Sequence, residues 1–416
     1  MGIIMMINIA PFQYSMLENE VISRVGHKNI GIIYALPEDV PEQQVKQAVQ
    51  GIFELFPALS STFEKSSGEW QAFLKEHDIS SRYGELECDE NESFTEATNR
   101  ILYDYSCHLD VANGPLSRFI LIKKGAERKI LFIGNHLVYD KLSLRNIEAC
   151  LWKLLYNKTN ALPKCRFLDW TEEVSHYFYN DFHNDIPYWL ETDWGQSARV
   201  PAFIHQENKP ATRANWTQRF SPSASQALLS AVGGSVTLID LLLAKLNLAV
   251  YEFTSSPSLA IELWNNGRDS LKDRSSVGPY ASFWPLFIER PSGTLLNIAQ
   301  DIAGIRSAAP PKYGYLLGKY KKGNARVNEL FQHIPSPQFK INFIGHISSS
   351  YQSMNKLSRV AKIPSRIPID HSAYSHISLI FSVEDGIVTM DWSHSSAAYR
   401  KEQLQQIAQI MTSMPV

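Results

Sequence analysis

The sequence predicts an α/β protein made of two related halves. Strand-length apolar runs alternate with helical patterns along the chain, and two strands, a histidine-bearing turn and an amphipathic helix occur in this order in both halves. With 416 residues the chain is long enough for two domains. A change of composition in the middle of the chain separates the halves. We predict an N-terminal domain at 1–175 and a C-terminal domain at 176–416 that includes the joint between them.

The composition indicates a well-packed protein and argues against several classes of function. Of the residues, 44% are hydrophobic and 20% are charged, and the 40 basic and 42 acidic residues leave a formal charge of -2. Since no basic run could follow a phosphate backbone, we expect no nucleic-acid partner. The four cysteines have neither metal-binding nor paired spacing, and no segment approaches the roughly 20 apolar residues of a membrane span. We therefore expect a cytoplasmic protein with no disulfide, metal site or membrane segment.

In the N-terminal half, the pattern predicts helices and strands that lead to a central turn. Pro41 begins an amphipathic helix, which is expected to pack on a sheet. A second, more polar helix is expected near Phe94–Tyr105. The predicted strands are Gly31–Leu36, Leu59–Phe63, Trp70–Leu74, Leu116–Lys123 and Lys129–Ile133.

In the C-terminal half, the aromatic segment Tyr177–Trp189 predicts one helix, and Thr237–Phe253 is apolar enough for a helix buried on most sides. Further helices are expected at Leu295–Arg306 and Lys401–Met411. The predicted strands are Leu259–Trp264, Phe283–Glu289, Lys340–Ile344, His376–Val383 and Ile387–Trp392, with Pro285 interrupting the second of them.

The candidate catalytic residue is a histidine where a strand gives way to a helix. The apolar run Ile130–Ile133 stops at Gly134, and His136 and Asp140 follow before a helical pattern begins. An imidazole titrates near neutrality, so a histidine held at this junction can remove a proton from an incoming hydroxyl or amine. The carboxylate of Asp140 would hold the turn or the imidazole tautomer. The alternative interpretation is a turn histidine followed by a helix-capping aspartate without catalytic function.

Two further histidines follow predicted strands, His346 in INFIGHIS and His394 in SHSSAAY. Only the first turn keeps an aspartate four residues after its histidine. We therefore predict one catalytic centre, with structural roles for His346 and His394. The sequence has no glycine-rich phosphate loop, CxxC, HExxH or GxSxG motif, so nucleotide, zinc and serine-hydrolase functions lack their usual support.

Long stretches of the chain resemble the condensation and epimerization superfamily of non-ribosomal peptide synthesis. Residues 114–144 are similar to the region around that superfamily's HHxxxDG motif, and Ile186–Leu190 resembles the segment that links its two halves. Residues 239–288 resemble the epimerization branch especially, as do KYGYLLG at 312–318, INFIG at 341–345 and the stretch 367–395. The similarity covers nearly the whole chain in the right order.

The resemblance implies two subdomains of the chloramphenicol acetyltransferase-like fold, each a mixed β-sheet with flanking helices, arranged as a V-shaped pseudo-dimer. In similar enzymes the motif histidine lies in a tunnel between the halves and is open to a carrier protein on each side. By this resemblance His136 is the catalytic histidine and Asp140 the structural aspartate. The phosphopantetheine arm of the carrier would bring the substrate, with no permanently bound cofactor.

Four positions depart from the family pattern. Asn135 stands where the first motif histidine would be, and Lys141 stands where the glycine would be. Trp264 occupies the position of a glutamate that serves the epimerization branch as its second acid or base, and tryptophan cannot ionise. Ser60 stands where related proteins commonly have an arginine near the motif aspartate, a role that Arg268 would take over by pairing with Asp140.

Several residues near the expected tunnel are candidates for substrate binding. They are Asn135, Lys141, Trp264, Asn266, Arg268, Asn342 and Phe343. Each has a structural alternative, since an aromatic such as Trp264 is as often packed in a core and a lysine such as Lys141 is more often a solvated surface charge.

From these observations we expect a stand-alone condensation-type acyltransferase of peptide natural-product biosynthesis. It would form an amide or ester from a carrier-bound acyl or aminoacyl thioester and a small amine or alcohol, and it would act as a monomer. Two alternatives remain open. One is an epimerase-like enzyme that acts on a carrier-bound aminoacyl group, and the other is a non-catalytic homologue that binds a carrier protein or a partner synthetase.

Overall fold

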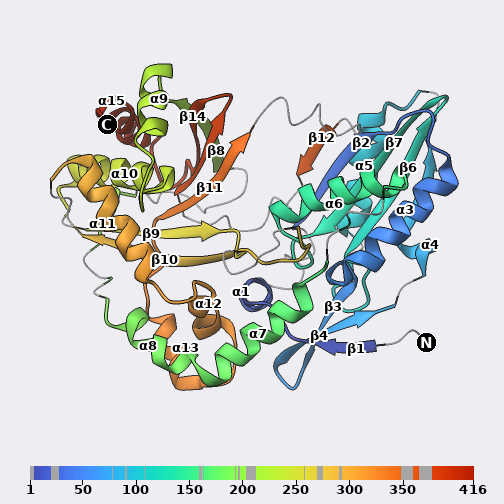
Figure 1. Cartoon of the computed structure of the whole chain (residues 1–416), viewed down its shortest axis with the longest axis horizontal. Coiled ribbons are helices and arrows are strands. Elements are labelled where there is room, and N and C mark those ends of the chain that lie inside the picture. Colours follow the sequence, from blue (N-terminus) through green and yellow to red (C-terminus); the bar gives the residue numbers. More distant parts are fainter. Residues whose placement is uncertain are drawn as a thin grey trace.

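The computed structural model describes residues 4–19, 28–76, 78–89, 91–107, 109–158, 162, 164–192, 194, 197–202, 212–256, 258–268, 275–289, 293–347, 359–364 and 377–416. Figure 1 shows two lobes that are joined at one end and separate at the other, each with its own large sheet. This arrangement agrees with the predicted V shape. Of the stretches compared with the superfamily above, residues 257, 269–274 and 367–376 lie outside the described residues.

The N-terminal lobe is built on a mixed sheet with strand order β12-β2-β7-β6-β5. Odd and even positions of its central strands face different helices, as the two-residue period of a strand requires. Ile32 and Phe132 pack in the main core with α3 and α6, whereas Ile33 and Leu131 pack in a separate cluster with α5. The elements are β2 (Asn29–Ala35), α3 (Glu42–Leu55), β5 (Tyr83–Glu87), α5 (Phe94–Cys107), β6 (Ser117–Lys124), β7 (Glu127–Asn135), α6 (Lys141–Leu155) and β12 (Arg359–Pro364).

A smaller antiparallel sheet, with order β1-β4-β3, lies beside this lobe, and the helix α1 lies between the lobes (Figure 1). The strand β12 comes from the C-terminal half of the sequence but pairs with β2, so the C-terminal half contributes a strand to the N-terminal lobe. The elements are β1 (Ile4–Ile7), α1 (Pro11–Asn19), the 3-10 helix η1 (Pro57–Ser60), β3 (Ser61–Ser66), β4 (Glu69–Lys75) and α4 (Ile79–Arg82).

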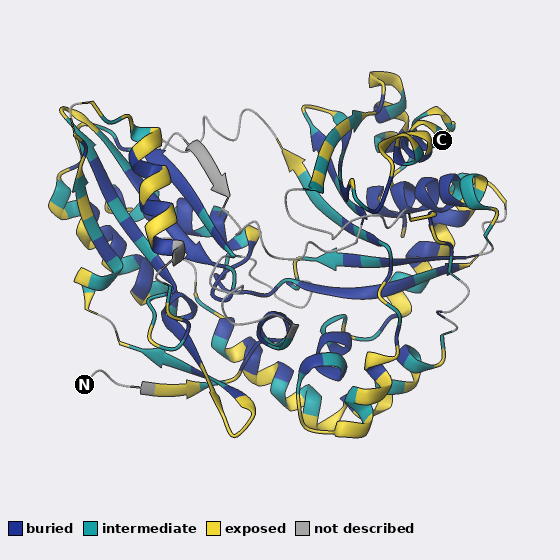
Figure 2. Cartoon of the chain, turned by 180° about the vertical axis from the view of Figure 1, so that it is seen from behind, coloured by how far each residue is buried: buried dark blue, intermediate teal, exposed yellow. Residues whose placement is uncertain are grey.

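The C-terminal lobe is built on a sheet with strand order β10-β9-β11-β13-β14-β8. Its helix-covered face packs against α9, α10, α11 and α15, and α10 is buried along almost its whole length (Figure 2). The strands are β8 (Arg213–Arg219), β9 (Ser258–Asn265), β10 (Ser282–Glu289), β11 (Phe339–Ile347), β13 (Ile377–Glu384) and β14 (Ile387–Ser395). The covering helices are α9 (Pro222–Ser230), α10 (Leu238–Thr254), α11 (Leu295–Ala308) and α15 (Lys401–Ser413).

Helices at the joined end connect the two lobes (Figure 1). They are α7 (Phe167–Asn180), α8 (Phe182–Leu190), α12 (Tyr313–Tyr320) and α13 (Ala325–Gln332). The predicted domain division at residue 175 falls within α7. The single helix predicted at Tyr177–Trp189 is in fact the end of α7 and all but the last residue of α8, since the helical pattern is interrupted at Asp181.

An internal repeat relates the two large sheets. The hairpin of β6 and β7, at 117–124 and 127–135, recurs as β13 and β14 at 377–384 and 387–395, which is a constant offset of 260 residues. A parallel neighbour flanks each hairpin on one side, β5 or β11, and an antiparallel neighbour flanks it on the other, β2 or β8. A helix follows each hairpin, starting at Lys141 or Lys401. The predicted relation between the halves is therefore confirmed.

The same offset shows that the turns of His136 and His394 do not correspond as the sequence pattern predicted. His394 lies within strand β14 and is 2% exposed, whereas His136 follows the end of β7, so these two histidines are not equivalent. The position equivalent to His136 is Ser396, and the position equivalent to Asp140 is Arg400. The second copy of the repeat therefore has the same backbone arrangement but lacks the histidine and the aspartate.

A second correction concerns Pro285, which does not interrupt β10. Among the described strands, β10 pairs only with β9, so it forms an edge of the sheet. A proline is tolerated in an edge strand because its missing N–H can lie on the side without ladder bonds.

The turn after β9 requires a glycine. Gly267 has a φ of 65°, and a Cβ added there would lie 1.7 Å from the backbone oxygen of Tyr280. The left-handed conformation alone costs a non-glycine residue about 1–2 kcal/mol. By contrast, Gly304 in α11 has open space around it.

We predict that Gly267→Ala lowers the free energy of unfolding by at least about 2 kcal/mol, because it adds a clash to the strained φ. Gly304→Ala is the matched control and should raise the free energy of unfolding by about 0.5–1 kcal/mol, since alanine is the better helix former. Urea denaturation followed by tryptophan fluorescence measures both. Equal effects of the two substitutions would contradict the structural requirement at Gly267.

Candidate active site

The candidate site is built around the turn between β7 and α6. His136 directly follows the last residue of β7, its backbone N–H donates to the carbonyl of Lys28 at 3.0 Å, and its side chain is partly exposed. Its imidazole stacks on the ring of Tyr139, with ring centroids 5.3 Å apart and planes 25° from parallel. The imidazole is therefore oriented by a neighbour while part of the side chain remains accessible.

Buried polar groups fix the backbone of this turn. The hydroxyl of Tyr139 donates to the carbonyl of Gly134 at 2.9 Å, and burial raises the pKa of Tyr139 so that it stays a donor. A side chain at Gly134 would lie 2.6 Å from the ring of Tyr139, which explains the glycine. The carbonyl of Leu137 accepts from the side-chain amide of Gln13 at 2.7 Å. Helix α1 therefore supports the turn that presents His136.

The carboxylate of Asp140 is fully engaged by protein donors. Its Oδ1 accepts from the backbone N–H and the hydroxyl of Ser143, both at 2.9 Å, which caps the start of α6. The guanidinium of Arg268 donates to both oxygens, at 2.5 Å to Oδ2 and 3.0 Å to Oδ1, and the backbone N–H of Tyr280 adds a bond of 3.2 Å. Asp140 is only 5% exposed, and its carboxylate is held by protein donors at the start of α6.

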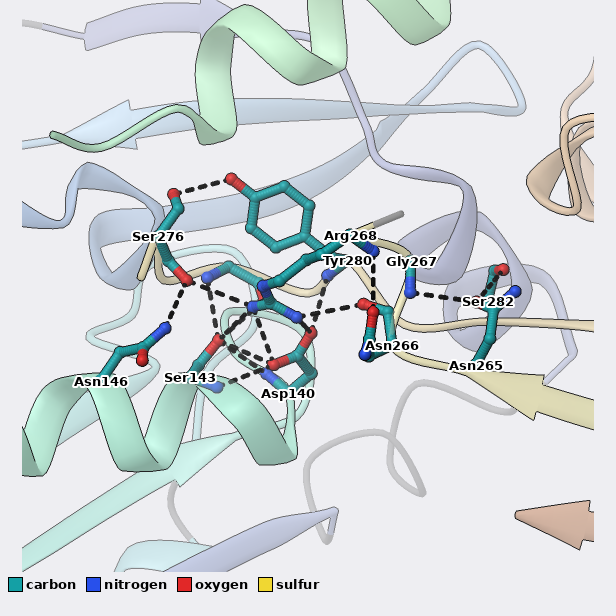
Figure 3. Close-up of polar contacts among 11 residues, drawn as sticks. Asp140, Ser143, Asn146, Asn265, Asn266, Gly267, Arg268, Ser276, Tyr280 and Ser282 are labelled. Carbon is teal, nitrogen blue, oxygen red and sulfur yellow. Dashed lines mark hydrogen bonds and ion pairs between the residues drawn. The ribbon is translucent and has the colours of Figure 1, made fainter. Parts of the chain in front are cut away.

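Arg268 is the structural partner of Asp140, as Figure 3 shows. Its side chain has no exposed surface, and its guanidinium lies 4.2 Å above the ring of Tyr280. The sequence-based hypothesis that Arg268 compensates for Ser60 is confirmed in its main point, the pairing with Asp140. The geometry gives no support for a direct contact between Arg268 and a substrate.

Further hydrogen bonds fasten the segment after β9 to the first turns of α6 (Figure 3). The hydroxyl of Ser143 bonds to the backbone of Gly278, and the side-chain amide of Asn146 donates to the carbonyl of Ser276 at 3.0 Å. These contacts join residues about 130 positions apart in the sequence. The C-terminal half thus holds the helix whose start carries Asp140.

Trp264 belongs to an aromatic and charged cluster. Its indole stacks on Phe283 at 4.8 Å between centroids and meets Phe12 of α1 edge-on at 5.7 Å. Its Nε1–H donates to the carboxylate of Glu262 at 2.6 Å. The ammonium of Lys340 lies 4.0 Å from the centre of the indole and 3.5 Å from the same carboxylate. An ionisable pair therefore lies directly beside the tryptophan.

The other predicted binding residues differ in their exposure. Lys141 and Asn266 are exposed, while Asn342 and Phe343 of β11 are partly buried, and Asn342 pairs with Trp264 on the neighbouring strand. Asn135 is fully buried, where its side-chain amide bonds to Asn29 and its side-chain oxygen accepts from the backbone N–H of Leu137. Asn135 therefore shapes the turn and, like Arg268, has no surface for a substrate.

The structure also places here several residues that no sequence motif marked. Glu262 and Lys340 lie in predicted strands two residues before Trp264 and Asn342, so the strand period would have put them on the same face. The support from Gln13 and Tyr139 has no comparable sequence signal, because it depends on contacts between distant segments.

Metal binding and membrane insertion have no structural signal in the described part of the chain. None of its clusters of histidine, cysteine, aspartate or glutamate has three members placed to hold a metal ion. None of its helices combines the length and the apolar character that crossing a bilayer would require.

Comparisons with known proteins agree with this architecture. The family model described as "Condensation domain" matches residues 11–414. A linear gramicidin synthase of Brevibacillus parabrevis is 24% identical over 432 residues, which cover 96% of this chain but only 8% of that protein. The chain thus spans a small part of this curated relative.

Solved structures show the same fold. The epimerization domain from the third module of tyrocidine synthetase B has a TM-score of 0.75 at 18% identity, with 99% of this chain and 95% of that chain covered. The condensation domain from Monacolin K polyketide synthase has a TM-score of 0.73 at 13% identity, with 98% and 97% covered. The predicted fold class and the resemblance to this superfamily are confirmed. Because the family model matches nearly the whole chain, the protein belongs to the condensation domain family, whose members are in general acyltransferases.

Proposed function

We propose that this protein transfers an acyl or aminoacyl group from a carrier-bound thioester to an amine or hydroxyl, giving an amide or an ester. The partner is a carrier protein or carrier domain whose phosphopantetheine arm holds the thioester, and the acceptor is a small molecule. The two lobes, divided near residue 175, face each other across the site. Since one chain already supplies both lobes, we propose that it acts as a monomer.

The observation that supports this proposal is the contrast between His136 and Asp140. His136 is partly exposed and its ring is held by Tyr139, whereas Asp140 is buried and saturated with hydrogen bonds. Of the two, the histidine is the accessible group, and an imidazole is a side chain suited to proton transfer.

One residue can carry out both proton transfers of this reaction. The imidazole of His136 takes the proton of the nucleophile as its nitrogen or oxygen attacks the thioester carbonyl. The tetrahedral intermediate then breaks its carbon–sulfur bond, and the imidazolium returns the proton to the departing thiolate. General-base assistance of this kind contributes about 10²- to 10⁴-fold. Aligning the two reactants between the lobes contributes more, since good alignment recovers about 7–11 kcal/mol.

We predict that His136→Ala lowers the rate of product formation by at least about 10²-fold without unfolding the protein. The assay offers a panel of acyl and aminoacyl carriers together with amine and alcohol acceptors, and mass spectrometry detects the amide or ester. His346→Ala is the matched control, because His346 is an exposed histidine at the end of β11, and it should leave the rate unchanged. Equal rates for wild type and His136→Ala would reject the assignment.

Exchange of an α-proton is a second candidate, and the position of Glu262 favours it. Its carboxylate lies on the same strand face as Trp264 and next to Lys340, so ionisable groups are present although Trp264 itself cannot ionise. An aminoacyl carrier incubated in deuterated water would gain α-deuterium if this were the activity. Acyl transfer predicts no such uptake, and binding of a loaded carrier with neither outcome would indicate the non-catalytic alternative.

A further inference from the structure

Hydrogen bonds from the N-terminal sheet hold the backbone of the turn that presents His136. The N–H of Val138 donates to the carbonyl of Asn135 at 3.0 Å and closes a β-turn, of which His136 and Leu137 are the central residues. The N–H of His136 donates to the carbonyl of Lys28 at 3.0 Å. The N–H of Leu137 donates to the side-chain oxygen of Asn135 at 2.9 Å. These partners belong to the turn itself or to the segment just before β2, which pairs with β7, so they move together with the sheet.

A further bond to this turn comes from a different element, the helix α1. The side-chain amide of Gln13 donates to the carbonyl of Leu137 at 2.7 Å, across 124 positions of the sequence. The side-chain oxygen of Gln13 accepts from the N–H of Ala10, the residue just before α1, also at 2.7 Å. Gln13 is fully buried, as are Ala10 and Leu137. A single amide, which carries both a donor and an acceptor, therefore completes the start of α1 and holds the turn.

An apolar side chain of similar size could fill the space of Gln13. It would leave the N–H of Ala10 and the carbonyl of Leu137 buried without these partners, and a buried group that loses its partner costs about 1–3 kcal/mol. Movement of the turn is the means by which the carbonyl of Leu137 could find another partner. The bond from Gln13 therefore opposes such a movement.

Helix α1 is itself held by the C-terminal half of the chain. Successive residues of an α-helix are rotated by about 100°, so neighbouring side chains reach different surroundings. Phe12 meets the indole of Trp264 in β9 edge-on, with ring centroids 5.7 Å apart. The hydroxyl of Tyr14 accepts from the ammonium of Lys321, directly after α12, at 3.0 Å. Gln13 lies between these two contacts, so α1, which lies between the lobes in Figure 1, ties the turn after β7 to β9 and α12.

We propose that Gln13 is a positioning residue for His136 in the acyl-transfer step. The proposal rests on the proposed function and extends it to a residue without exposed surface. Through the carbonyl of Leu137, Gln13 fixes the peptide group one residue beyond His136, and with it the direction in which the imidazole meets the nucleophile. A displacement of about 1 Å in a reacting group can reduce a rate about 10²-fold, so a bond this close to the base has a large effect.

Gln338 offers a matched control for Gln13. Its side-chain amide donates to the carbonyl of Val200 at 3.1 Å, and its side-chain oxygen accepts from the N–H of Val200 at 2.8 Å. The two glutamines therefore form the same pair of bonds to the backbone, but Gln338 directly precedes β11 and bonds within the C-terminal half. A difference between Gln13→Met and Gln338→Met reports the place of Gln13 beside the turn, and not the loss of two hydrogen bonds as such.

Nuclear magnetic resonance of the imidazole reports on His136 without any substrate. Protein with isotopically labelled histidine gives a ring signal for His136, identified as the signal that His136→Ala removes. We expect Gln13→Met to shift or split this signal and to leave the signals of the other histidines in place. Gln338→Met should leave the His136 signal unchanged. An unchanged His136 signal in Gln13→Met, or equal changes in the two variants, would overturn the proposal.

The transfer assay tests the effect of Gln13 on the reaction. Gln13→Met should lower kcat at least about tenfold and change KM less than about twofold, because the imidazole acts in the transition state and substrate binding does not depend on its direction. Gln338→Met should keep the kcat of the wild type. An unchanged kcat in Gln13→Met, or a change confined to KM, would contradict a positioning role.

Gln13→Glu tests the donor alone and keeps the acceptor for the N–H of Ala10, so it also serves if Gln13→Met fails to fold. The new carboxyl can donate to the carbonyl of Leu137 only while it is protonated, and burial raises its pKa. The kcat of Gln13→Glu divided by that of the wild type, a ratio that removes the titration of His136 itself, should therefore fall as the pH rises. A ratio that stays constant between about pH 5 and pH 9 would contradict the role of the donor.

The two measurements separate this proposal from the proposed function. Absence of transfer by the wild type would reject the proposed function. The resonance measurement needs no turnover, so it would still decide whether Gln13 sets the position of His136.

Discussion

The buried ion pair between Asp140 and Arg268 is the contact on which the rest of the candidate site depends. It joins the start of α6, just after the turn of His136, to the segment after β9 in the other half of the chain. Two charges removed from water are costly unless their hydrogen bonds are satisfied, and here Ser143 and Tyr280 supply the remaining donors to the carboxylate. The pair therefore locks the geometry of the two lobes and leaves His136 as the accessible group.

The second copy of the internal repeat lacks the two side chains around which the candidate site is built. The hairpin and the following helix recur with an offset of 260 residues, yet Ser396 and Arg400 stand at the positions of His136 and Asp140. A serine cannot serve as a base near neutrality, and an arginine at the helix start cannot pair with Arg268. The second copy instead contributes the hairpin of β13 and β14 to the sheet of the C-terminal lobe.

Much of this structure could be predicted from the sequence, because strand and helix periods are local signals. The hairpins, the helix beginning after Pro41 and the junction at His136 all lie where the pattern placed them. The pairing of Arg268 with Asp140 was predictable as a hypothesis, since the resemblance implied an arginine partner for Asp140 and position 60 holds a serine. The resemblance supplied the fold class, which local patterns alone give only as an α/β protein.

The remaining features depend on contacts between distant segments, and no local pattern reports them. His394 and His136 have similar sequence surroundings, but His394 lies in a strand and His136 in a turn. The strand β7 ends one residue before His136, whereas β14 ends one residue after His394. The cluster of Trp264, Glu262 and Lys340 arises only when β9 and β11 pair in parallel. The turn of His136 was therefore predictable from the sequence, whereas the charged groups beside Trp264 were not.

The most direct measurement of the central contact is a double-mutant cycle on the free energy of unfolding with Asp140→Asn, Arg268→Met and their combination. Each single substitution leaves the other group buried without its partner, so each should cost about 3–5 kcal/mol. The double variant should cost about 2–3 kcal/mol less than the sum of the two. Additive costs, within about 0.5 kcal/mol, would show that the two groups are not coupled and would contradict this account of the site.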